Sequence, residues 1–75
     1  MDDVVAAIGE AAQLVGSESM LASLLGLVRS NVSYWKRVKE VPAEHCLEIE
    51  RLTDRAVRCE RLNKRVDWSY VRNAV

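Results

Sequence analysis

Residues 21–37 read LASLLGLVRSNVSYWKR, and their character changes around a single glycine, Gly26. Apolar residues at helical spacing lie on both sides of that glycine, at Leu21, Leu24, Leu25, Val32 and Trp35. Glycine tolerates backbone conformations that a Cβ would oppose, so it can form a sharp corner. The stretch therefore predicts a helix-turn-helix, with one short helix ending at Gly26 and the next running over about 29–37.

The flanking residues predict further helices. An apolar stripe predicts an amphipathic helix over about 3–15 that ends at Gly16, with inward residues Val4, Val5, Ile8, Ala11, Ala12 and Val15. Ser17 or Glu18 would then open the first helix of the helix-turn-helix. Pro42 fits the first turn of a fourth helix. The residues expected to face the core from that helix are Ala43, Cys46, Leu47 and Ile49.

The C-terminal third gives weaker signals. A break at Thr53-Asp54 precedes a short helix expected around residues 58–63, and only residues 56–59 suggest a strand, weakly. The tail has no clear period, so a helical turn and an extended arm both remain open. We therefore expect one all-α domain over residues 1–75, a compact bundle of about five short helices, with residues 57–75 as a candidate dimerisation or tail segment.

Charge is distributed unevenly along this formally neutral chain. Residues 1–28 contain four acids and no cation, whereas residues 29–39 contain four cations and no acid. A neutral chain with a local basic segment can still attract phosphate there. The absence of a long apolar run predicts no membrane span, and the acidic N-terminus predicts no signal peptide.

A helix-turn-helix needs a small residue where its helices cross, and Ala22 meets that need as Gly26 does at the corner. The chain resembles the small Cro-like and YdaS-like helix-turn-helix regulators of phages and prophages. The matching motifs are Leu21-Ala22, Leu25-Gly26, Val32-Ser33-Tyr34-Trp35, Pro42, Cys46-Leu47-Glu48-Ile49-Glu50 and Asp67-Trp68.

The resemblance implies a lambda-repressor-like fold and a DNA-binding transcriptional repressor that inserts the helix over about 29–37 into the major groove. By this resemblance the DNA-facing residues are Val28, Arg29, Ser30, Ser33, Tyr34 and Arg37. Arginine can read a guanine edge or hold a phosphate, serine can donate to either, and tyrosine can meet a thymine methyl. Lys36, Lys39 and Arg37 suit backbone phosphates better than bases. One such helix reads few base pairs, so a homodimer on operator DNA is expected.

Val28 departs from the family pattern, which has Ser or Thr at the helix cap. Valine has no side-chain acceptor, and a lost cap costs about 1 kcal/mol. Ser30 or Asn31 could instead cap a helix that starts later.

No residue pattern predicts an enzyme, a metal site or a cofactor. Cys46 and Cys59 match no metal spacing and are expected to be reduced thiols in a cytoplasmic protein. His45 is expected to be solvated, and Glu50 is a candidate for an ion pair without an identifiable partner. Trp68 and Tyr70 could cover either this domain's core or a second subunit.

Two other functions fit the same residues. The chain could be an antitoxin that binds DNA and also a toxin partner, which an adjacent toxin gene would favour. It could also be a protein-interaction domain that keeps the fold without binding DNA, as its zero net charge and Val28 allow.

Overall fold

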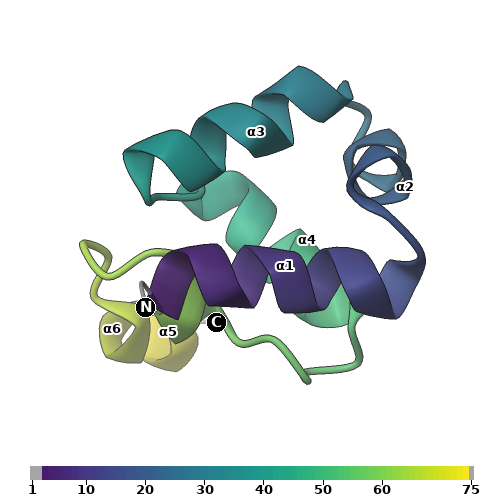
Figure 1. The fold of residues 1–75 in the computed structure, drawn as a ribbon. Coiled ribbons are helices and arrows are strands. Elements are labelled where there is room, and N and C mark those ends of the chain that lie inside the picture. The colour runs from purple at the N-terminus through teal and green to yellow at the C-terminus, as the bar shows by residue number, and fades with distance from the viewer. Residues whose placement is uncertain (1–2, 75) are drawn as a thin grey trace.

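The computed structural model describes residues 3–74, which contain six helices joined by turns and loops and no strand (Figure 1). In chain order they are α1 (Asp3–Val15), α2 (Glu18–Leu24), α3 (Arg29–Val38), α4 (Ala43–Leu52), α5 (Cys59–Leu62) and α6 (Trp68–Ala74). The all-α prediction is confirmed, with one helix more than the expected five. Residues 1, 2 and 75, which the sequence analysis assigned to the same domain, lie outside the described residues.

The C-terminal third is more helical than its sequence indicated. The short helix expected around 58–63 is α5, and the tail forms α6 rather than an extended arm. The weak strand prediction for residues 56–59 was wrong, because this segment is a turn leading into α5. Pro42 is the N-cap of α4 rather than part of its first turn, since its ψ of 140° is extended.

α1 provides much of the core and packs against α2, α3 and α5. Its buried side chains recur at helical spacing: Val4, Ala7, Ile8, Ala11 and Ala12. The expected stripe is therefore rotated slightly, because Val5 and Val15 are only half-buried. The small alanines let neighbouring helices approach α1 closely, which suits a chain with few residues to fill a core.

Three residues expected to face the core do not. Leu24 and Leu47 are 47% and 44% exposed, and Ala43 is also exposed. α2 buries only Leu21 and Ala22, and the buried apolar residues of α4 are Cys46 and Ile49. A domain of this size has too few elements to cover both flanks of each short helix, so part of each predicted apolar stripe stays in solvent.

The corner between α2 and α3 is built as the sequence predicted. Ser17 caps α2, its Oγ accepting the N–H of Met20 at 3.0 Å. Gly26 has a φ of +74°, and the next N–H, from Leu27, donates to the carbonyl of Ala22 at 2.8 Å. This left-handed glycine reverses the chain so that α3 starts close to the end of α2.

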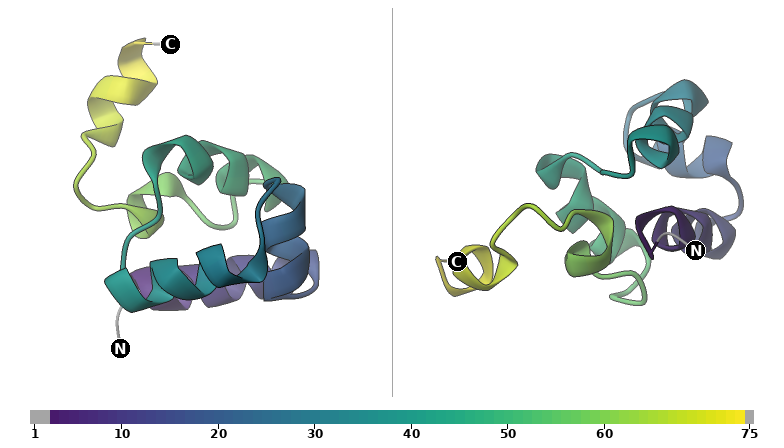
Figure 2. Two further views of the ribbon diagram at one scale, coloured as in Figure 1. Left: turned by 90° about the horizontal axis from the view of Figure 1, so that it is seen from above. Right: turned by 60° about the vertical axis from the view of Figure 1, so that its left-hand side comes forward.

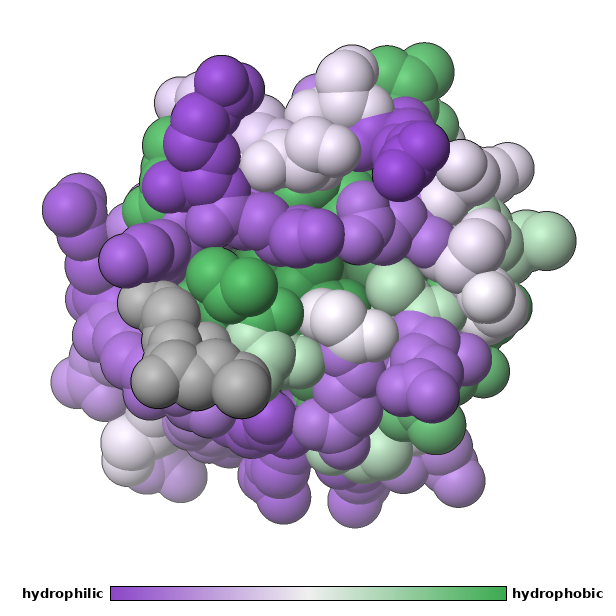
Figure 3. Space-filling model, in the orientation of Figure 1, coloured by the Kyte–Doolittle hydropathy of each residue, from purple (hydrophilic) through white to green (hydrophobic). Residues whose placement is uncertain are grey.

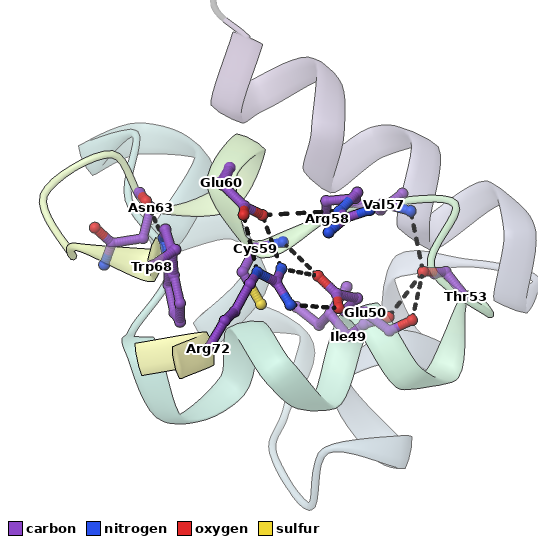
Figure 4. A network of polar contacts seen from close by, with 10 residues as sticks. All are labelled: Ile49, Glu50, Thr53, Val57, Arg58, Cys59, Glu60, Asn63, Trp68 and Arg72. Carbon is purple, nitrogen blue, oxygen red and sulfur yellow. Dashed lines mark hydrogen bonds and ion pairs between the residues drawn. The ribbon is translucent and has the colours of Figure 1, made fainter. Parts of the chain in front are cut away.

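A buried carboxylate joins α4, α5 and α6 (Figure 4). Glu50 of α4 is only 8% exposed, and its Oε1 accepts the N–H of Cys59 at 3.0 Å, at the start of α5. The same oxygen lies 2.7 Å from Nη2 of Arg72 on α6. Arg72 also donates to both oxygens of Glu60, at 2.8 and 2.9 Å. Glu50, the candidate for an ion pair, is therefore buried, and its partner is Arg72.

α6 lies at the edge of the bundle, away from α1, α2 and α3 (Figure 2). Trp68 anchors it to this domain's own core, being 5% exposed and donating its indole N–H to the carbonyl of Asn63 at 2.7 Å. Tyr70 is 72% exposed. The two aromatic residues thus have different roles, which the sequence had left open.

The left-handed glycine of the corner predicts a pair of opposite stability changes. Gly26→Ala should lower the free energy of unfolding by about 1 kcal/mol, because an L-residue is strained at this φ although no atom lies within 4 Å of the added Cβ. Gly9→Ala is the matched control, since Gly9 lies inside α1 with equally open surroundings, and it should raise stability by about 0.5–1 kcal/mol. Urea denaturation measures both. Equal effects of the two substitutions would refute the role of Gly26.

The Glu50 network predicts acid sensitivity. The hydrogen bond from Arg72, with help from the Cys59 N–H, lowers the pKa of Glu50 from 4.5 to about 2. A depressed carboxyl pKa stabilises the fold above about pH 4.5, and this contribution is lost as pH falls toward 2. Glu50→Gln should therefore be less stable than the parent at neutral pH, and the difference should shrink in acid. A difference in unfolding free energy that stays constant from pH 7 to pH 2.5 (roughly the window of this titration) would contradict the assignment.

Candidate nucleic-acid interface

α3 is covered by the rest of the domain on one side only. Of its residues only Val32 and Trp35 are buried, and the helix lies along the edge of the molecule opposite α5 and α6 (Figure 1). Mostly hydrophilic and near-neutral side chains cover this edge (Figure 3). The two buried residues are three apart, so they hold one side of α3 against the core and leave the other side in solvent.

All eight residues predicted to contact DNA, whether bases or phosphates, lie on α3 or at its two ends. Val28 is the N-cap and Lys39 the C-cap. Every one is exposed except Lys36, which is partly buried; the set is Val28, Arg29, Ser30, Ser33, Tyr34, Lys36, Arg37 and Lys39. Residues 29, 33 and 37 recur at i, i+4 and i+8 and therefore share a face that is about 12 Å long. A DNA major groove is about 12 Å wide, which admits an α-helix with its side chains.

α3 begins at Arg29 as predicted, and the alternative of a later start capped by Ser30 or Asn31 was wrong. Val28 makes no side-chain cap, and it is 64% exposed. Asn31 compensates from inside the helix, because its Oδ1 accepts the N–H of Val28 at 3.2 Å. The missing hydroxyl at the cap is thus offset by an amide one turn later.

Tyr34 and Arg37 form a unit on the exposed face. The guanidinium carbon of Arg37 lies 5.6 Å from the centre of the Tyr34 ring, which is within the range of a cation–π contact. Tyr34 is 52% exposed, so its hydroxyl and ring edge remain accessible beside the cation. The arrangement can present a hydroxyl, an apolar edge and a positive charge together.

Sequence reasoning missed one residue beside this face, Glu18 in the first turn of α2. Its Oε2 lies 2.7 Å from Nζ of Lys36, and its Oε1 lies 3.9 Å from Nε of Arg29. A single carboxylate therefore contacts two of the predicted DNA-facing cations. The sequence signal was only that an acidic segment precedes a basic one, and the fold is needed to bring these residues together.

His45 supports α3 from below rather than standing in solvent as expected. Its ring centre lies 5.5 Å from that of Trp35, and it is partly buried. The contact adds an aromatic neighbour to the residue that anchors α3. His45 thus packs against the buried side of α3, opposite its exposed face.

Both cysteines lie in the core rather than on the exposed side of α3. Cys46 and Cys59 are free and buried, and burial raises the pKa of each thiol to about 12. Within residues 3–74, no group of three His, Cys, Asp or Glu side chains is arranged to hold a metal ion. None of the described helices is long and apolar enough to span a membrane.

Comparison with known proteins agrees with this architecture. The family model described as "Bacterial toxin YdaS" matches residues 8–71. A protein of Escherichia coli (strain K12) named "Putative transcriptional regulator YdaS" is 44% identical over 66 residues, which cover 87% of this chain and 67% of that protein. Neither it nor the solved structure described next carries the name of an enzyme.

The solved structure is that of the Cro protein from "putative prophage element Xfaso 1" in Xylella fastidiosa strain Ann-1. It is similar with a TM-score of 0.72 and 44% sequence identity, over 83% of this chain and 89% of that one. The family match spans the helix-turn-helix, α4 and α5, and most of α6. This chain therefore belongs to the YdaS family, and its fold is that of a Cro-like helix-turn-helix protein.

Proposed function

We propose that this protein is a sequence-specific DNA-binding transcriptional repressor of the Cro type, with α3 inserted into the major groove. The observation that carries the proposal is the division of α3 into a buried side and a polar, cationic outer side. The outer side has hydrogen-bonding groups of the kinds that read base edges in the major groove. The names of the E. coli and Xylella relatives favour the same role.

The exposed side chains divide into base-reading and phosphate-binding sets. Ser33 and Tyr34 lie on the middle turns of α3, where base edges would be within reach, and Tyr34 offers an apolar edge for a thymine methyl. Arg29 and Ser30, in the first turn, can reach bases or phosphates. Arg37, Lys36 and Lys39 lie toward the C-terminal end and suit phosphates on the backbone.

A homodimer on a pseudo-palindromic operator completes the proposal. One α3 contacts only a few base pairs, and two copies would read half-sites about 34 Å apart, or one helical turn. Much of the apolar surface in the segment 57–75 is used within the domain, because Val57, Leu62 and Trp68 are buried. The surface left for a second subunit is the outer face of α6, where Tyr70 is exposed.

The family description also contains the word toxin, so a role in a toxin–antitoxin pair is the second candidate. In the antitoxin form of that role the chain would bind DNA and a toxin partner. The regulator role is favoured because both relatives described above carry regulator or Cro names. A toxin gene adjacent to this one would reverse the preference.

Selection of bound sequences from a random pool of duplex DNA tests the proposed function directly. We expect an enriched pseudo-palindrome whose half-site centres are separated by one helical turn. Enrichment of a single unpaired half-site would remove the dimer from the proposal. Failure to bind any duplex at low salt would overturn DNA binding and favour the protein-interaction alternative, because non-specific binding is strongest there.

Arg37→Ala should weaken binding to every duplex, whatever its sequence. Removal of one phosphate contact should reduce the slope of log affinity against log salt by about one. Arg51→Ala is the matched control, because it removes an exposed arginine from α4 and should leave the slope unchanged. A loss of affinity confined to one base position would contradict the phosphate role of Arg37.

Tyr34→Ala should change the preferred sequence rather than the salt slope. Loss of the ring removes its apolar contact and its hydroxyl, and discrimination at one position should fall by about 1–3 kcal/mol. Repeating the selection with the variant measures this effect. An unchanged preferred sequence would exclude Tyr34 from base reading.

A further inference from the structure

We propose that Glu18 competes with DNA phosphates for Arg29 and Lys36 and so limits the affinity of α3 for DNA of any sequence. The inference rests on the proposed function and deepens it by naming a residue that regulates the same surface. Glu18 is not itself part of the exposed face of α3, because it comes from the first turn of α2. Its effect acts through the two cations that it contacts.

The geometry places one carboxylate against two cations. Glu18 Oε2 and Lys36 Nζ are 2.7 Å apart, which is the distance of a charge-assisted hydrogen bond. The second oxygen is 3.9 Å from Nε of Arg29, a weaker contact. Arg29 and Lys36 are seven residues apart and so lie on the same side of α3, two turns from each other.

Partial burial strengthens the ion pair between Glu18 and Lys36 more than the one between Glu18 and Arg29. The side chain of Glu18 is 23% exposed and that of Lys36 is 36% exposed, whereas that of Arg29 is 69% exposed. A partly desolvated ion pair is screened less by salt than a fully exposed one. Lys36 is therefore held more firmly than Arg29. A phosphate that binds either cation must displace the carboxylate of Glu18 or share the cation with it.

The competition has a direct consequence for recognition. Phosphate contacts raise affinity for all DNA without distinguishing sequences, while base contacts supply discrimination. A carboxylate that pairs with cations able to bind phosphates lowers the sequence-independent part of the affinity for DNA. The ion pairs of Glu18 are with Arg29 and Lys36, whereas Arg37 lies over the ring of Tyr34. Glu18 thus shifts the balance of binding toward base reading.

Glu18→Gln tests the proposal, because it keeps the size of the side chain and removes its charge. Binding of the full chain to a short duplex of mixed sequence is measured by fluorescence anisotropy across about 50–200 mM sodium chloride. The variant should bind this non-operator duplex about three- to tenfold more tightly at low salt, with a slope steeper by about one to two. An affinity and slope equal to those of the parent, or weaker binding, would overturn the proposal.

Glu10→Gln is the matched control for the change in net charge. Glu10 is also paired with an arginine at 2.7 Å, but that residue is Arg61 and lies outside α3. The gain in affinity should therefore be larger for Glu18→Gln than for Glu10→Gln. Equal gains would mean that only net charge matters, and the specific competition would be refuted.

A double variant localises the effect. Adding Lys36→Met to Glu18→Gln should remove part of the gained affinity and about one unit of the gained slope. Retention of the whole gain would exclude Lys36 as the competing cation.

Thermal unfolding checks that each variant folds. If Glu18→Gln is unfolded, Glu18→Asp replaces it, because this substitution shortens the reach of the carboxylate by one methylene. The Glu18→Asp variant should then show a gain in affinity in the same direction.

The design separates this inference from the proposed function. If the parent chain binds no duplex at any salt concentration, DNA binding itself fails and the inference fails with it. If the parent binds and Glu18→Gln behaves like the parent, the repressor proposal stands and only the role of Glu18 is refuted.

Discussion

The attachment of α3 to the core by Val32 and Trp35 is the contact on which the rest of the surface depends. These are the only buried side chains of the helix, and they lie on one side of it. The opposite side is therefore exposed by necessity. Ser33 and Tyr34, which lie between the two anchors, and Arg29 and Arg37, which lie before and after them, face solvent. Trp35 is the larger anchor, and His45 packs beside it, so the orientation of α3 is fixed from α4 as well as from the core below. A small domain can hold α3 with so few contacts because α1 and α2 supply closely packed small residues against it, among them Ala11 and Ala22.

The fold pairs several of the cations outside α3 with acidic residues that are distant in sequence. The chain is neutral, yet many cations outside α3 are paired with acids from distant segments: Lys64 with Asp3, Arg61 with Glu10, Arg65 with Glu40 and Arg72 with Glu50 and Glu60. These pairs join the C-terminal third to α1, to α4 and to the loop between α3 and α4. On α3 the acid opposite the cations is Glu18, while Arg37 has no acidic partner among the described residues. Zero net charge is therefore compatible with a locally positive α3 surface.

The helix-turn-helix was the most predictable part of the fold. Ala22, Gly26, Val32 and Trp35 each have one residue type that suits their position, and the observed φ of Gly26 and the burial of the other three agree with that expectation. Leu24 and Leu47 were misplaced because periodicity identifies apolar faces but cannot show which of them another helix covers. Helix α6 was not predictable from its period, because contacts with residues outside it, from Trp68 to Asn63 and from Arg72 to Glu50, hold it in place. The Glu18 contacts were hidden for the same reason, since they join residues 11 and 18 positions apart only after the chain turns at Gly26.

The central claim is that the exposed side of α3 is the surface that meets DNA. Titration of the ¹⁵N-labelled chain with duplex DNA, followed by amide chemical shifts, tests it most directly. The account predicts that the largest shift changes lie in residues 28–39, with smaller changes in α2 and little change in α5 and α6. Shift changes concentrated in α4, α5 or α6, with α3 unaffected, would contradict it.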